Sequence, residues 1–439
     1  MHKELKEKAI EVLKFNDMGN YTRPAPDLYP HQWLWDSCFS SIGWSYIDTN
    51  RAQKEIYSFF RGQWSNGMIP HMIFSTDKAQ TKQSKTGFWE SNVSPYAPTN
   101  IETSGITQPP LMAEAVARVG EKLSLEDRKN FYKRVYPRIL AHHKWIYRER
   151  NPHAEGLAIL IHPWENGLDN SPPWVIEMHK HQKPWWIKAI EASHFDVVIE
   201  RLRRDTKQVS AEERASTIDS LILYNVVRRL KRKQYDAEQI LLRSHFLIED
   251  LFFNCILVRN NKILGEIAKE IGATIPTETQ HFMNKSTKSL EELWDRDTGQ
   301  YYSRNFVTRK PIMESTIATL MPLYAGTITK RRAEELVRLL KDEHQFGLPY
   351  PIPSVPLKSK FFNPRRYWQG PTWVNTNWLI IDGLKRYGYH QEANRIKNHT
   401  IELAQKSGFH EYFSPLDGYG AGIQPFSWTA ALIIDLLEN

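Results

Sequence analysis

Residues 112–120 read MAEAVARVG, and this stretch shows the pattern that decides the fold class. Its apolar side chains, among them Met112, Val116 and Val119, recur at intervals of three and four residues. That spacing places them on one face of an α-helix. Gly120 follows directly and is predicted to end the helix as its C-cap.

The same helical periodicity appears in other parts of the chain. The clearest cases are residues 5–13, 333–340 and 426–437. Ser124 and Ser210 are each followed three residues later by an acidic residue, which is the pattern of a helix-capping box. Alternating strand patterns are scarce, and we expect only a short hairpin arm at Leu157–Ile161. The sequence therefore predicts an all-α fold.

Long segments rich in Trp, Tyr, Pro and Gly separate the predicted helices. They cover residues 20–36, 62–110, 162–186, 346–377 and 408–428. Loops of this length in a compact fold are usually functional or disordered, and their aromatic content favours function. The sequence has no low-complexity segment, flexible linker or repeat. We therefore expect one domain, residues 1–439, with the loops converging at one end.

The composition excludes several classes of protein. Of 439 residues, 12% are aromatic, and many of the 15 Trp stand beside polar residues in the long loops, which is typical of a sugar-facing pocket. The net charge is +8, from 58 basic and 50 acidic side chains. The basic clusters lie in helical patterns with acidic neighbours, so we interpret them as solvated helix faces. We expect no nucleic-acid partner.

The cysteine count and the N-terminus bear on redox state and location. Cys38 and Cys255 are far apart and lie outside any metal-binding spacing, so we expect no disulfide, no metal and no cofactor. The first residues are charged and lack an apolar targeting segment. No apolar run approaches the ~18 residues that a membrane span needs. We expect a cytoplasmic protein without a membrane partner.

Two loop segments offer polar groups suited to a sugar. In Tyr29–Ser37, Asp36 follows two tryptophans; it can accept two sugar hydroxyls while an indole covers the apolar face of the ring. The alternative is that Asp36 caps a helix and the tryptophans are core residues. Further along, Gln63, His71 and Gln108 supply neutral donors and acceptors, although such residues are often structural.

Carboxylates and aromatic residues alternate in three further segments. In His162–Trp174, Glu165 and Asp169 lie among indoles, and burial against them would raise the pKa of a carboxyl group toward that of a general acid. The chemistry of the segment alone does not rank these two residues. Glu411 stands between aromatic residues just before a Pro/Gly turn, and Tyr367–Trp378 forms another aromatic stretch.

Taken in this order, the segments resemble the clan of (α/α)6-barrel glycosidases that includes trehalases and glycoside hydrolase family 63. The resemblance is strongest to the short bacterial members of family 63, which hydrolyse mannosylglycerate or glucosylglycerate. It extends from about Tyr29 to Trp428. It implies an (α/α)6 toroid and an inverting α-glycosidase that cleaves a small α-glycoside into free sugar and glycerate.

The resemblance also implies roles for individual residues. Asp169 matches the general acid, Glu411 the general base, and Asp36 a carboxylate that binds sugar hydroxyls. Other positions that match the sugar pocket are Trp33, His71, Gln108, Trp164, Gly167, Tyr367, Trp368 and Trp428. Those expected near the glycerate-like leaving group are Tyr29, Gln369 and Gln424.

The chain departs from the family pattern at two places. Gln369 stands where many family members have Arg. The loop 72–95 looks individual to this protein and is expected to affect the leaving-group subsite. Its notable residues are Lys78, Lys82, Lys85 and Trp89.

Several alternatives remain open at the level of sequence. The substrate could be trehalose or another short α-glucoside, and the choice between gluco and manno configuration is open, as is the oligomeric state. A sugar isomerase or epimerase would rely on His for proton transfer, whereas carboxylates are the best-placed polar residues here. A non-catalytic carbohydrate-binding protein would not need two separated carboxylates in aromatic loops.

The absence of a Cys/His ligand set gives a direct prediction. Because the proposed acid and base act on protons alone, activity should persist after exhaustive treatment with a chelator. The measurement is the hydrolysis rate before and after chelation, with a sample resupplied with Ca²⁺ as the control. A loss of activity that a divalent ion restores would contradict the prediction.

Overall fold

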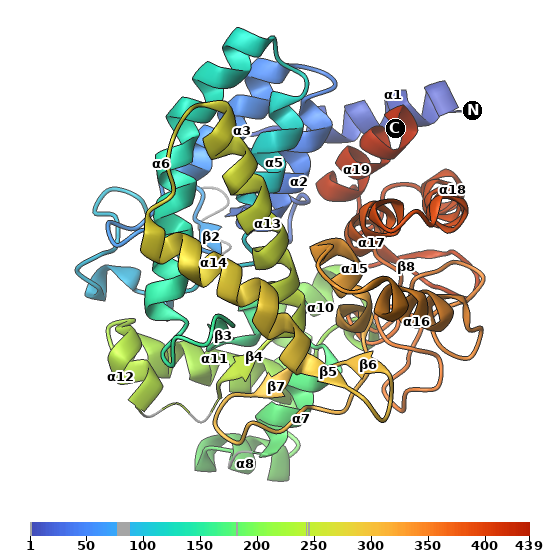
Figure 1. The fold of residues 1–439 in the computed structure, drawn as a ribbon. Helices are drawn as coiled ribbons and strands as arrows, with labels where there is room; N and C mark the ends of the chain where they lie inside the picture. The colour runs from blue at the N-terminus through green and yellow to red at the C-terminus, as the bar shows by residue number, and fades with distance from the viewer. Residues whose placement is uncertain (1, 77–87, 181–182, 243, 245) are drawn as a thin grey trace.

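The computed structural model describes residues 2–76, 88–180, 183–242, 244 and 246–439, and it is mostly helical (Figure 1). The α-helices are α1 (His2–Phe15), α2 (Leu34–Trp44), α3 (Thr49–Phe60), α5 (Met112–Gly120), α6 (Leu125–Glu149), α7 (Pro172–Lys180), α8 (Trp185–Ala192), α9 (Asp196–Leu202), α10 (Arg204–Gln208), α11 (Thr217–Arg232), α12 (Ala237–Leu242), α13 (Leu251–Glu270), α14 (Thr277–Ser289), α15 (Pro322–Ala325), α16 (Lys330–Lys341), α17 (Val374–Arg386), α18 (His390–Ser407) and α19 (Ser427–Glu438). Short 3-10 helices are η2 (Ser91–Val93), η3 (Pro163–Glu165), η4 (Ala211–Glu213), η5 (Leu290–Leu293) and η6 (Ile317–Leu320).

The strands are two residues long and all pair antiparallel. They are β1 (Gln32–Trp33), β2 (Met72–Ile73), β3 (Ile159–Leu160), β4 (Ile248–Glu249), β5 (Trp294–Asp295), β6 (Gln300–Tyr301), β7 (Arg304–Asn305), β8 (Tyr412–Phe413) and β9 (Gly420–Ala421). The expected hairpin arm around residue 159 is β3, but it pairs with the distant β4 and not with a neighbouring strand.

The predicted helix ends are confirmed in one case and wrong in two. The Ser124 side chain accepts a hydrogen bond from the Asp127 N–H and caps α6, as predicted. Ser210 precedes η4, and its side chain makes no capping bond, so the capping box predicted there is wrong. Helix α5 continues through Gly120, and its C-cap is Glu121.

In the described part of the chain, six helices contact one another in a closed ring: α2, α5, α13, α15, α17 and α19. Each ring helix also packs against one outer helix. Taken in the order of the ring, the outer helices are α3, α6, α14, α16, α18 and α1. This double ring is the (α/α)6 toroid that the sequence predicted. The ring closes where α19 meets α2, which brings the two chain ends together (Figure 1), and Lys6 pairs with Glu438 at 2.5 Å.

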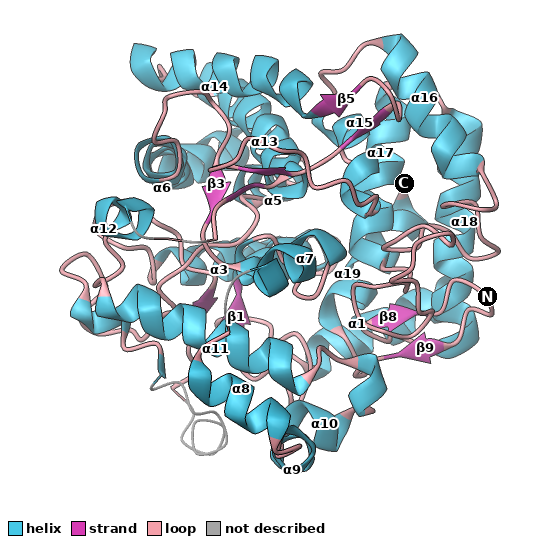
Figure 2. Cartoon of the chain, turned by 90° about the horizontal axis from the view of Figure 1, so that it is seen from below, coloured by secondary structure: helices cyan, strands magenta, loops and turns pink. Residues whose placement is uncertain are grey.

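The main core lies inside this ring. Its buried apolar residues run from Leu5 to Leu436, and two smaller clusters lie under the loops. Figure 1 places α7, α8, α11 and α12 at the lower end of the molecule, and Figure 2 looks onto that end. Among the described helices, none has both the length and the apolar character needed to cross a membrane.

The α2–α19 contact depends on a glycine. A Cβ on Gly43 of α2 would stand 2.5 Å from the Cα of Ala431 on α19, far inside contact distance. Both helices are almost entirely buried, so neither can move away without disturbing the core. The close approach that closes the ring therefore requires Gly43.

We expect Gly43→Ala to destabilise the protein by about 1–3 kcal/mol, because overpacking forces the core apart. Gly265→Ala on α13 is the matched control, since a Cβ there meets no atom within 4 Å. Alanine is favoured over glycine inside helices, so the control should leave the melting temperature unchanged or raise it. Thermal unfolding measures both. Equal melting temperatures for the two variants would contradict the prediction.

Candidate active site

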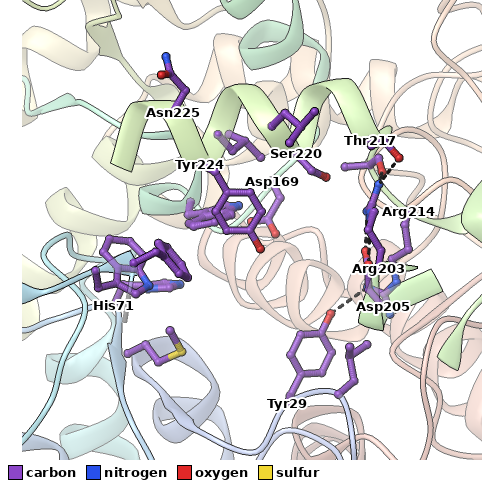
Figure 3. A pocket seen from close by; sticks show the side chains of 18 of the residues that line it. Tyr29, His71, Asp169, Arg203, Asp205, Arg214, Thr217, Ser220, Tyr224 and Asn225 are labelled. Carbon is purple, nitrogen blue, oxygen red and sulfur yellow. Dashed lines mark hydrogen bonds and ion pairs between the residues drawn. The ribbon is translucent and has the colours of Figure 1, made fainter. Parts of the chain in front are cut away.

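A cavity of about 980 Å³ lies at the loop end of the ring (Figure 3). Among the described residues, those lining it come from the segment before α2, from the loops after β2 and η3, from α8 to α11, and from the loop before α17. Six residues that the sequence nominated line this cavity: Tyr29, Trp33, His71, Trp164, Asp169 and Tyr367.

The surroundings of Asp169 favour the protonated form of its carboxyl group. Burial raises its pKa to about 7, and the negative charge of Glu411 acts in the same direction. The hydroxyl of Tyr367 donates to Oδ2 at 3.4 Å and, with the charge of Arg214, opposes the rise. The sequence attributed this shift to neighbouring indoles, but the Trp174 indole N–H donates to Asp250. Close to neutral pH, Asp169 holds a proton that it can release.

Glu411 is surrounded by hydrogen-bond donors. Arg214 donates to it at 2.7 Å through a buried ion pair, and the Tyr29 hydroxyl donates at 2.9 Å. The backbone N–H of Ile423, from beyond the hairpin turn, donates at 3.2 Å. These contacts fix the position of the carboxylate.

Arg214 is the site residue that the sequence analysis missed. It lies between η4 and α11, is buried, and its guanidinium is 5.0 Å from the ring centre of Tyr367. A single Arg in a chain with 58 basic side chains carries no local signal. Only its position opposite Glu411 distinguishes it.

Asp36 lies in the first turn of α2, whose N-cap is Trp33, so the cap interpretation is wrong. Burial raises its pKa well above the usual range, and the charges of Glu411 and Asp169 add to the effect. Three nominated carboxylates from distant parts of the chain thus share one electrostatic environment. Asp36 itself is not among the residues that line the 980 Å³ cavity.

The structure separates Glu165 from Asp169, which the sequence could not rank. Glu165 is fully buried and accepts hydrogen bonds from the Ile161 N–H at 2.8 Å and from Arg150 at 3.1 Å. A third contact, 3.4 Å long, comes from the Thr107 N–H. Glu165 therefore holds the loop in place, whereas Asp169 faces the cavity.

The aromatic residues form a buried layer between the Asp169 loop and α2. Trp35 contacts the rings of Trp368 and Trp428 with centroids 6.1 and 5.1 Å away. Gly167 has φ 75°, and a Cβ on it would stand 2.7 Å from the Trp35 ring. Only glycine lets the loop lie this close to Trp35.

Two nominated glutamines lie in the same region as this layer. The Gln108 side-chain oxygen accepts from the Trp35 backbone N–H at 3.3 Å. Gln369 donates to the carbonyl of Asn170 at 2.8 Å, and so holds the loop that follows Asp169. Both are buried and contact the backbone of neighbouring segments.

Gln424 lies apart from these residues. Its side chain is exposed, near Gly408, and it is not among the described residues that line the cavity. In the 72–95 loop, Trp89 is buried and lines the cavity beside His71. The nominated lysines of that loop, Lys78, Lys82 and Lys85, lie outside the described residues.

Two histidines near the cavity, His71 and His162, are neutral at ordinary pH. Burial lowers the pKa of His71 and of His162 to about 3. His71 stacks on Trp164 and contacts the Ser104 hydroxyl at 3.2 Å. A neutral, buried imidazole of this kind is a poor proton shuttle at neutral pH, which disfavours the isomerase alternative.

Glu411 is buried behind two residues that line the cavity, Tyr29 and Arg214. A toroid with one carboxyl group facing a cavity and a second, arginine-bound carboxylate just behind its lining is typical of the glycoside hydrolases of the (α/α)6 type. The family model described as "Mannosylglycerate hydrolase MGH1-like glycoside hydrolase domain" matches residues 29–429. The chain belongs to this family, within glycoside hydrolase family 63, and it is a glycoside hydrolase.

Relatives resemble the chain along its whole length. It is 38% identical to a mannosylglycerate hydrolase of Thermus thermophilus, covering 97% of this chain and 99% of that protein. It is 29% identical to the glucosylglycerate hydrolase of Mycolicibacterium hassiacum, covering 99% and 98%. A crystal structure of mannosylglycerate hydrolase from Thermus thermophilus, in complex with Tris and D-glycerate, matches with a TM-score of 0.87 and 36% identity, covering 98% and 99%.

The raised pKa of Asp169 predicts a pH-dependent stability. Its pKa is about 7 in the native protein and about 3.9 in an unfolded chain. Between these values only the native state keeps the proton, so Asp169 lowers stability as pH rises through that window. Asp169→Asn should therefore raise the melting temperature at pH 8 by more than at pH 4.

Thermal unfolding at several pH values checks this, with exposed Asp297→Asn as the control. The control should shift the melting temperature equally at both pH values. An Asp169→Asn shift that is likewise independent of pH would contradict the raised pKa.

Proposed function

We propose that the protein hydrolyses an α-hexoside of glycerate, mannosylglycerate or glucosylglycerate, with inversion at the anomeric carbon. The observation that carries the proposal is Asp169, with a pKa raised to about 7, next to a carboxylate held by Arg214. The names of the full-length relatives support the substrate class. The products are the free sugar and glycerate.

Asp169 is the general acid in this proposal. In its protonated form it donates to the glycosidic oxygen as the bond to the anomeric carbon breaks. Glu411, held by Tyr29 and Arg214, removes a proton from the attacking water. Because that water must fit between Glu411 and the sugar, we expect the two carboxyl groups to lie roughly 6.5–9.5 Å apart.

Arg214 offers a hydrogen-bond donor, unpartnered within the described residues, to the carboxylate of the substrate. Arg214 uses two of its nitrogens on Glu411, while its Nε has no acceptor in the described part of the chain. Arg203 also lines the cavity, where it pairs with Asp205 at 2.6 Å. An Nε–H left without a partner at a buried site is a donor that the carboxylate of a glycerate leaving group would satisfy.

The sugar is expected to bind above the aromatic layer, with Asp36 accepting its hydroxyls. Such hydrogen bonds strengthen in the transition state and contribute several kcal/mol to catalysis. Relatives named for the manno substrate and for the gluco substrate both match the chain along its length. We therefore propose a hexosylglycerate of manno or gluco configuration as the substrate.

The test is a hydrolysis panel of mannosylglycerate, glucosylglycerate, trehalose and kojibiose, followed by proton NMR of the fresh product. We expect turnover of at least one hexosylglycerate and initial release of the β-anomer from the α-glycoside. Asp169→Asn and Glu411→Gln should each nearly abolish turnover. Exposed Asp297→Asn is the control and should keep the wild-type rate.

Two results would contradict the proposal. Turnover confined to trehalose or kojibiose would remove glycerate from the substrate. Initial release of the α-anomer would make Glu411 a nucleophile and not a base.

A further inference from the structure

The cavity continues well past the catalytic carboxylates along one face of α11. The residues of α11 that line it include Thr217, Ser220, Tyr224 and Arg228, and Lys231 lies at the far end. Their spacing of three and four residues is that of one helix face. From Thr217 to Lys231 the helix rises about 21 Å at 1.5 Å per residue. A leaving group as short as glycerate occupies only the inner part of such a wall.

The outer part of this wall carries aromatic surface. Tyr224 extends from α11 into the cavity (Figure 3), and 47% of the residue remains exposed. It is held edge-on by Phe88 at 5.1 Å and by Trp164 at 6.0 Å between ring centres. Trp186 of α8 lines the same cavity. Exposed aromatic rings in a cavity offer apolar faces on which the C–H groups of a sugar ring can pack.

A cation stands one helical turn beyond Tyr224. Arg228 lines the cavity and is exposed, and it makes no ion pair with the described part of the chain. The other cations of the lining have carboxylate partners there: Arg203 with Asp205, Arg214 with Glu411 and Lys231 with Glu90. Among the described lining residues, Arg228 is thus the cation whose charge is uncompensated.

We propose that this outer part of the cavity, formed by Tyr224, Phe88, Trp186 and Arg228, binds a longer leaving group. Its ligand is a second hexose that packs on Tyr224 and carries a hydroxy acid whose carboxylate reaches Arg228. The inference rests on the proposed function and widens its substrate class from hexosides of glycerate to hexosides of a hexosyl-glycerate.

The chemistry is the same single hydrolysis. The bond between the terminal hexose and the inner hexose breaks, water supplies the new anomeric hydroxyl, and the inner hexose oxygen takes the proton of Asp169. The products are free hexose and a hexosyl-glycerate. That second product is itself of the class proposed above, so the same site would then hydrolyse it in a second turn.

The experiment compares two probes: a hexosylglycerate, and the same hexose α-linked to glucosylglycerate. The quantity measured is the ratio of kcat/KM for the long probe to kcat/KM for the short one. Tyr224→Ala and Arg228→Gln should each lower that ratio about tenfold, the size of one lost charge-assisted or stacking contact. Arg229→Gln is the matched control, since its exposed side chain is not part of the lining, and should leave the ratio unchanged.

The outcomes separate the two proposals. Hydrolysis of the short probe without the long one overturns the outer subsite and leaves the proposed function standing. The outer subsite is also overturned if the ratio of the two kcat/KM values is the same in every variant as in the wild type. If neither probe is hydrolysed, the proposed function fails, and calorimetric binding to Glu411→Gln decides the subsite. Tighter binding of the long probe that Tyr224→Ala removes supports the subsite, and equal binding of both probes overturns it.

Discussion

Arg214 and Glu411 form a buried ion pair, 2.7 Å long, that joins the segment before α11 to the β8–β9 hairpin. The charge of Glu411 acts on both Asp169 and Asp36, so three carboxyl groups interact with one another away from bulk water. Buried charges are costly unless they are paired and hydrogen-bonded. Arg214 lowers the pKa of Asp169, but burial and the charge of Glu411 outweigh it and raise that pKa to about 7.

The toroid supplies the rigidity that this arrangement needs. Asp36 is part of α2, a helix whose residues are all buried and which meets α19 at the closure of the ring. The loop of Asp169 is fixed on one side by Glu165 and on the other by Gln369, through hydrogen bonds of 2.8 to 3.4 Å. A carboxyl group with a shifted pKa is useful only if its distance to its partners stays constant, and these contacts hold that distance.

The buried aromatic layer explains why so many tryptophans sit in loops. The Trp35 ring packs against Gly167 from one loop, against Trp368 from another loop and against Trp428 at the start of α19. Flat rings allow backbone segments without regular structure to pack as densely as helices do. The aromatic composition therefore serves the packing of the loops as well as the sugar pocket.

The helices could be predicted from the sequence because periodicity is a local property: the pattern at residues 112–120 is complete within one element. The resemblance of the chain to the (α/α)6 glycosidases also predicted the toroid, and it nominated Asp169 as the acid and Glu411 as the base. Without that resemblance, the chemistry of the segment could not separate Asp169 from Glu165, because both are carboxylates in one loop and only their partners and position differ. It also missed Arg214, whose significance comes from a partner 197 residues away. Such proximity exists only in the folded chain, so the tertiary structure alone decided which charges meet and hence which carboxyl groups have shifted pKa values.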